Sequence, residues 1–137
     1  MRLELDLPMP PSGNRIYFIW KRGKRSGISL TTEAKQYKRM MADVLLRDHA
    51  VALGGLDQDA AYRLVLCFHM HVYNKGWPDK AQSRYKKADI SNRILLLENG
   101  LKDTTGIDDC QNFELVVLKT NRTAEEEEHV RLMYEAL

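Results

Sequence analysis

Leucines alternate with charged residues at the start of the chain, which is the period-2 pattern of a half-buried strand. This pattern covers Leu3 to Leu7 and ends at Pro8, a residue that cannot continue a strand interior. The clearest alternation begins at Tyr62, where every second side chain is apolar. Shorter apolar alternations follow near the C-terminus. We therefore expect strands at 3–7, 62–72, 113–118 and 130–134.

Two segments instead repeat their apolar residues at helical spacing. Thr31 is a candidate N-cap, with Glu33 at the positive end of the helix dipole, for a helix that reaches about residue 50. A second helix starts at Asp89 or Ser91, runs to about Lys102 and is followed by a turn at Gly106. Strands and helices interleave without a regular βα repeat. The sequence therefore predicts one α+β domain over 1–137, with a mixed sheet of about four to five strands and two main helices on one face.

Basic and aromatic side chains gather in two segments, although the formal net charge of the chain is only +2. The first lies in a loop over 12–30, with a possible hairpin over 16–20, and the second follows the strand that starts at Tyr62. Such segments are typical of nucleic-acid interfaces. The candidate DNA-binding residues are Asn14, Arg15, Lys21, Arg22, Lys24, Arg25, Lys80, Arg84, Lys86, Lys87 and Arg93. Phe18, Trp20 and Trp77 are candidates to stack on bases or to wedge between them. It is equally plausible that Tyr17, Phe18 and Trp20 are hydrophobic anchors of the loop.

Carboxylates flank the second predicted helix. Asp89 and Ser91 stand at its start, and the pair Asp108-Asp109 follows its end. A Mg²⁺ ion needs only one or two carboxylates, because it keeps several of its water ligands. These residues are therefore candidate metal ligands, and the three aspartates are candidate catalytic residues. The alternative is that Asp89 caps the helix and that Asp108-Asp109 forms a turn.

Composition excludes several classes of protein. A hydrophobic content of 44% is sufficient for a packed core, so wholesale disorder is not expected. Cys67 and Cys110 are too few for a disulfide scaffold, and no apolar run approaches the ~20 residues that span a bilayer. We expect a cytoplasmic protein without a membrane segment. His69 and His71 have a spacing that can bind zinc. Without a third ligand nearby, we favour the interpretation that they lie on the sheet surface or at the edge of the core.

Three motifs in order resemble the RusA family of Holliday-junction resolvases. They are Pro10-Pro11-Ser12-Gly13-Asn14, then Asp89-Ile90-Ser91-Asn92, then Asp108-Asp109. The family pattern reads Pro-Pro-Ser-x-Asn, Asp-x-Asp-Asn-x-x-Lys and Asp-Asp. The resemblance implies a bacterial or phage-encoded, homodimeric endonuclease that cuts four-way DNA junctions with Mg²⁺, for which Mn²⁺ is the expected substitute.

Two positions depart from the family pattern. Ser91 stands where the family has its second Asp, and Leu95 stands where it has Lys. Arg93 or Lys87 is a candidate to replace the missing cation. Among the acids, Asp108 is a better candidate second ligand than Glu98 or Asp103.

Three functions remain open from the sequence. The first is an active Mg²⁺-dependent endonuclease that acts on branched DNA. The second is a descendant that binds junctions without cutting them, which the substitutions at Ser91 and Leu95 favour. The third is a protein-interaction domain without a DNA role.

Overall fold

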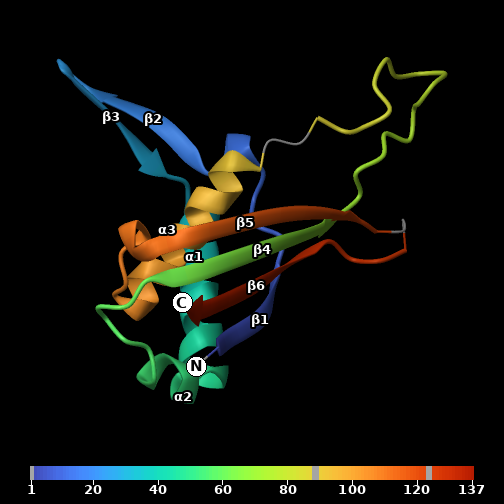
Figure 1. Cartoon of the computed structure of the whole chain (residues 1–137). Helices are drawn as coiled ribbons and strands as arrows, with labels where there is room; N and C mark the ends of the chain where they lie inside the picture. The colour runs from blue at the N-terminus through green and yellow to red at the C-terminus, as the bar shows by residue number, and fades with distance from the viewer. Residues whose placement is uncertain (1, 88–89, 123–124) are drawn as a thin grey trace.

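The computed structural model describes residues 2–87, 90–122 and 125–137. A four-stranded mixed sheet has two long helices on one face, and a separate two-stranded hairpin projects from it (Figure 1). This confirms the predicted α+β class. The strands are β1 (Arg2–Pro8), β2 (Tyr17–Arg22), β3 (Arg25–Leu30), β4 (Tyr62–Met70), β5 (Asn112–Asn121) and β6 (His129–Ala136). The α-helices are α1 (Thr32–Asp48), α2 (Ala50–Gly54) and α3 (Ser91–Thr105). Short 3-10 helices lie at η1 (Gly13–Arg15) and η2 (Asp109–Gln111).

The sheet order is β1-β6-β4-β5, and only β4 and β5 run parallel. Parallel strands cannot be joined by a tight turn, so the chain must cross back over the sheet between them. α3 is that crossover. It begins beyond the end of β4 and returns the chain to the end of the sheet where β5 starts.

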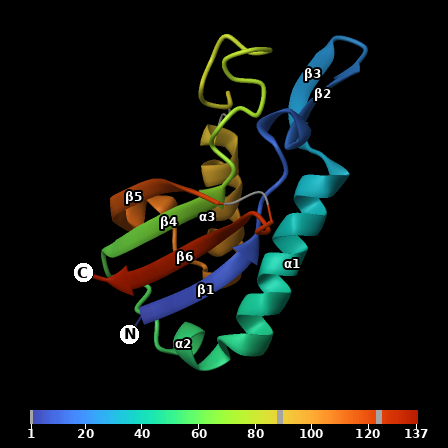
Figure 2. The same cartoon turned by 90° about the vertical axis from the view of Figure 1, so that its right-hand side faces the viewer.

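The core lies between the sheet and the helices (Figure 2). Every second residue of β4 is buried, from Tyr62 to Met70, and these side chains face the helices. The opposite face of the sheet carries ion pairs instead: Arg63 contacts Glu114 and Glu135, and Arg131 contacts Glu4. The protein is therefore a two-layer structure with a single core. No helix among the described residues is long and apolar enough to cross a membrane.

Local signals correctly predicted the first helix and its beginning. The backbone N–H of Ala34 donates to the Thr31 hydroxyl oxygen at 3.2 Å, which is the expected N-cap. The loop expected over 12–30 is mostly a hairpin, β2–β3, that extends well beyond 16–20. The turn expected after residue 53 begins inside α2, whose five residues were too few to show a helical period.

Helices α1 and α3 approach closely at Gly100. An ideal Cβ at this position would lie 2.6 Å from Met41 Sδ, and Met41 is fully buried. The absence of a side chain at Gly100 therefore allows the two helices to pack together against the sheet.

We predict that Gly100→Leu lowers the free energy of unfolding by about 2 kcal/mol, because the new side chain overpacks the α1–α3 contact. Gly54→Leu is the matched control, since nothing lies within 4 Å of a Cβ at that helical glycine. Urea denaturation of the two variants and the wild type measures the difference. Equal stabilities of the two variants would contradict the packing.

Candidate nucleic-acid interface

Two basic arms project from the same end of the domain. One is the β2–β3 hairpin and the other is the segment 71–87, and α3 begins between them (Figures 1 and 2). The side chains of the predicted DNA-binding residues on these arms are exposed to solvent: Lys21, Arg22, Lys24, Arg25, Lys80, Arg84, Lys86 and Lys87. Lys75 is exposed on the same arm.

Arginines on or next to the sheet are paired with described carboxylates, whereas the lysines and arginines of the arms are not. Arg2, Arg63, Arg122 and Arg131 of the sheet all lie within salt-bridge distance of carboxylates. None of the arm lysines and arginines forms an ion pair with another described residue. The guanidinium of Arg84 lies 5.5 Å and 5.8 Å from the ring centres of Tyr73 and Tyr85. The arms therefore present positive charge that no described carboxylate neutralises through an ion pair.

The first two sequence motifs meet at the base of the arms. Asn92 Nδ2 donates to the carbonyl oxygen of Gly13 at 3.4 Å, and Arg93 Nε donates to that of Pro11 at 3.1 Å. These bonds hold η1 against the first turn of α3. Asn14 and Arg15 are exposed there, whereas Arg93 is half-buried and uses its Nε for the backbone. The predicted candidates Asn14, Arg15 and Arg93 thus lie together.

Ser91, the predicted metal ligand at the second motif, is the exposed first residue of α3. Among the described residues, no side chain forms a capping hydrogen bond at this helix end, and the first turn carries no acid. Leu95 lies one turn further on and is 40% exposed. Asp89, the central candidate, lies outside the described residues.

The third motif lies along the C-terminal half of α3. Asp108 Oδ2 is 3.0 Å from Lys102 Nζ, and the Asp108 carboxylate also caps η2 by accepting from the N–H of Cys110. Gln111 completes this capping box by accepting from the N–H of Asp108. Asp108 therefore has the turn-forming role that we considered as the alternative to metal binding.

Asp109 lies close enough to Glu98 for its charge to affect that carboxyl group, whereas we expected it to share a metal site with Asp89. Burial raises the pKa of Glu98, and the negative charge of Asp109 raises it further. Ser91 is seven residues from Glu98, which corresponds to about 10 Å along the helix axis, so this arrangement does not bring Ser91 to the Asp108-Asp109 pair. The sequence offered Glu98 as a candidate acid but did not place it near Asp109, because this depends on how η2 folds back along α3.

Within 2–87, 90–122 and 125–137, no three His, Cys, Asp or Glu side chains are grouped so that they could hold an ion. A Mg²⁺ site at the second motif would therefore depend on Asp89.

His69 lies within β4 and His71 lies just beyond its end. The rings of His69 and His129 stack with centres 4.5 Å apart on neighbouring strands. His71 lies beyond the end of β4, and its Nδ1 is 3.0 Å from the carbonyl oxygen of Arg122. Burial lowers the pKa of His69, and so does the charge of Arg122.

No protein-family model matches the chain, and no characterised protein matches it significantly. The resemblance to the RusA family therefore rests on the three motifs alone.

We predict that Asp108 titrates far below an ordinary aspartate. Hydrogen bonding with Asp109, then with Lys102 and the N–H of Cys110, lowers its pKa to about 2. Because the folded pKa is depressed, the carboxylate adds stability above the unfolded pKa of about 4, and this stability is lost as pH falls towards 2. Carbon-detected NMR titration measures the pKa directly.

Lys102→Met should raise the pKa of Asp108, whereas Lys35→Met, on exposed α1 surface, should leave it unchanged. An Asp108 pKa near 4 in the wild type would contradict the contacts around η2.

Proposed function

We propose that this protein is a structure-selective endodeoxyribonuclease that binds branched DNA, such as four-way junctions, and hydrolyses it with Mg²⁺ in recombination or repair. Mn²⁺ is the expected substitute for Mg²⁺, and the cytoplasm of a bacterium, or of a phage-infected one, is the expected location. The proposal rests first on the unpaired cations of the two arms, and second on the motif resemblance.

The unpaired cations favour a polyanionic partner. A surface salt bridge contributes only ~0–1 kcal/mol. The arm cations form no ion pair with a described carboxylate, so none has to be broken when phosphates bind. Contacts of Lys and Arg with phosphates also release condensed counterions, which supplies much of the affinity of DNA-binding proteins. Two arms on either side of the α3 N-terminus suit a nucleic acid that lies across this end of the domain.

The arms also suit a branched rather than a linear duplex. A two-stranded β-ribbon has dimensions that a DNA groove admits. The second arm lies apart from the hairpin, so the two can contact different duplex segments of one junction (Figures 1 and 2).

Hydrolysis of DNA would also require Mg²⁺ ligands, which the basic arms do not supply. Asp89 would be the principal Mg²⁺ ligand, while Ser91 would add an uncharged oxygen. Asp108 is neutralised by Lys102, and the Asp108-Asp109 pair is not next to Ser91. This separation favours the second candidate function, a protein that binds junctions without cutting them. Arg93 and Lys87 lie near the second motif in the chain and are the candidate cations for a scissile phosphate.

We predict that the wild type nicks a labelled four-way junction in Mg²⁺ and that Asp89→Asn abolishes nicking without changing affinity. Junction affinity should fall roughly a thousandfold between about 50 and 200 mM salt if six or more phosphates are contacted. Gel electrophoresis measures nicks, and fluorescence anisotropy measures binding.

A negative result in either assay supports one of the two other functions. Salt-dependent binding without nicks over a range of metal and pH supports a binding protein. Absence of junction binding at low salt contradicts both DNA functions and leaves the protein-interaction domain.

We also propose that two copies pair through β5, which is one of the two edge strands of the sheet. Apolar side chains are exposed on both faces of this ten-residue strand, with Phe113 at 74% and Leu118 at 50%. The other edge, β1, carries the charged Arg2 and Asp6 and ends at Pro8, which are features that prevent edge pairing. A two-fold axis at β5 would give the dimer one nucleic-acid interface per copy for a nearly two-fold junction.

Leu118→Lys should convert the dimer to monomers, because the new charge would be buried between edges. Val51→Lys is the matched control, since Val51 is 84% exposed on α2. Light scattering coupled to gel filtration measures the mass. A monomeric wild type at micromolar concentration would contradict the interface.

A further inference from the structure

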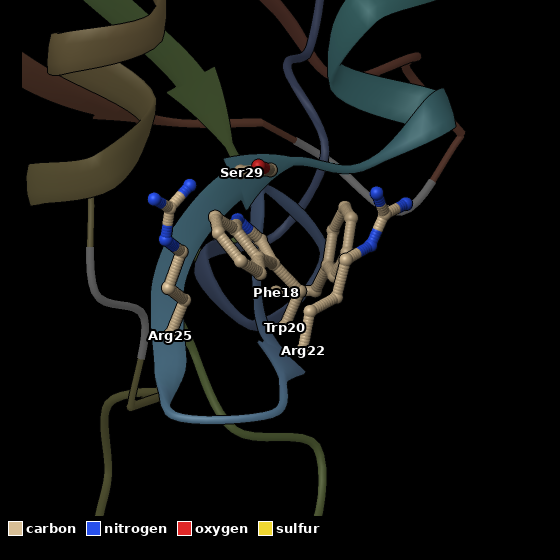
Figure 3. Close-up of a pocket in the computed structure, with 5 residues that line it drawn as sticks. All are labelled: Phe18, Trp20, Arg22, Arg25 and Ser29. Carbon is tan, nitrogen blue, oxygen red and sulfur yellow. The ribbon is translucent and has the colours of Figure 1, made fainter.

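One face of the hairpin combines aromatic rings with guanidinium groups. The antiparallel register pairs Phe18 with Ser29, Trp20 with Gly27 and Arg22 with Arg25, and paired residues share a face of a two-stranded sheet. Phe18, Trp20, Arg22, Arg25 and Ser29 line a hollow of about 460 Å³ on this face (Figure 3). We call these five residues and Gly27 the hairpin cradle.

Gly27 sets the position of the tryptophan ring. An ideal Cβ at residue 27 would lie 2.7 Å from Trp20 Cζ2 and 2.8 Å from Cε2. Only glycine therefore allows the indole to lie over the backbone of β3. The indole lies next to the Phe18 ring, with the Arg25 side chain on one side of the two rings and the Arg22 side chain on the other (Figure 3).

The cradle rings do not serve as anchors of the arm. Tyr17 and Leu30 at the base of the hairpin pack against the core, and Ile16 is fully buried. Phe18 and Trp20 are not among the side chains packed on the core, and Phe18 is 46% exposed. Tyr17 is therefore a hydrophobic anchor of the arm, whereas Phe18 and Trp20 are not.

We infer that the hairpin cradle binds an unpaired nucleobase, which stacks on Trp20 and Phe18 while its flanking phosphates contact Arg22 and Arg25. The inference rests on the proposed DNA-binding function and adds a preference for unstacked bases, which are present at an open branch point. An aromatic ring can stack on any base, so this site does not depend on sequence. Bases inside a continuous duplex are already stacked and cannot enter the cradle.

The opposite face of the hairpin supplies a matched control. Ile19 and Ile28 are cross-strand neighbours there, and they are 73% and 70% exposed. Their truncation removes apolar surface from the same arm without changing the cradle.

The test uses a short labelled oligothymidylate and a duplex of the same length as probes. In the Trp77→Phe background, where Trp20 is the remaining tryptophan, the oligothymidylate should quench Trp20 fluorescence saturably and the duplex should not. Trp20→Ala should weaken oligothymidylate binding about tenfold. One base–aromatic stack contributes ~1–3 kcal/mol to binding, and a tenfold change in Kd corresponds to about 1.4 kcal/mol. Ile19→Ala should bind like the wild type. Gly27→Ala, which keeps both rings and both arginines but displaces the indole, should also weaken binding.

The outcomes separate this inference from the proposed function. If Trp20→Ala and Gly27→Ala bind the oligothymidylate like the wild type, or if Trp20 emission does not change at saturation, the cradle does not bind bases. Salt-dependent junction binding would then still support the proposed function. If the wild type binds neither probe nor a four-way junction at low salt, both proposals are overturned.

Discussion

The parallel pairing of β4 with β5 is the constraint on which the rest of the structure depends. A parallel pair requires a crossover, and α3 makes it along one face of the sheet. The direction of α3 follows, so Ser91 lies at the end of the domain with the two arms, and Asp108 follows the other end of the helix. In the strand order β1-β6-β4-β5, β5 is one of the two edge strands of the sheet.

Charge is divided between the sheet and the arms in a way that composition conceals. The outer face of the sheet is covered by ion pairs such as Arg63 with Glu114 and Glu135, which oppose one another on neighbouring strands. Cross-strand pairs of opposite charge stabilise a sheet modestly and leave little net field. The cations of the arms lack such partners among the described residues. A net charge of +2 is therefore compatible with a strongly positive end of the molecule.

The hairpin arm can carry function because the core does not depend on most of it. An isolated two-stranded hairpin is marginally stable in water, so β2 and β3 need their anchorage at Tyr17, Leu30 and the buried Ile16. Gly23, with φ of +60°, occupies the left-handed conformation at the tip, where other residues would be strained. Between base and tip, the side chains make no contribution to the core. Aromatic rings and arginines can therefore remain exposed there.

The sequence by itself determined the features that depend on neighbouring residues. The alternation from Tyr62 identified β4, and Thr31 identified the start of α1, because strand burial and helix capping repeat over a few residues. It also located the basic and aromatic residues of both arms. Only the tertiary structure decided that Asn92 bonds to Gly13, that Asp109 approaches Glu98 and that β5 is exposed on both faces. These depend on strand order and on the path of the chain after α3, which local periodicity does not encode.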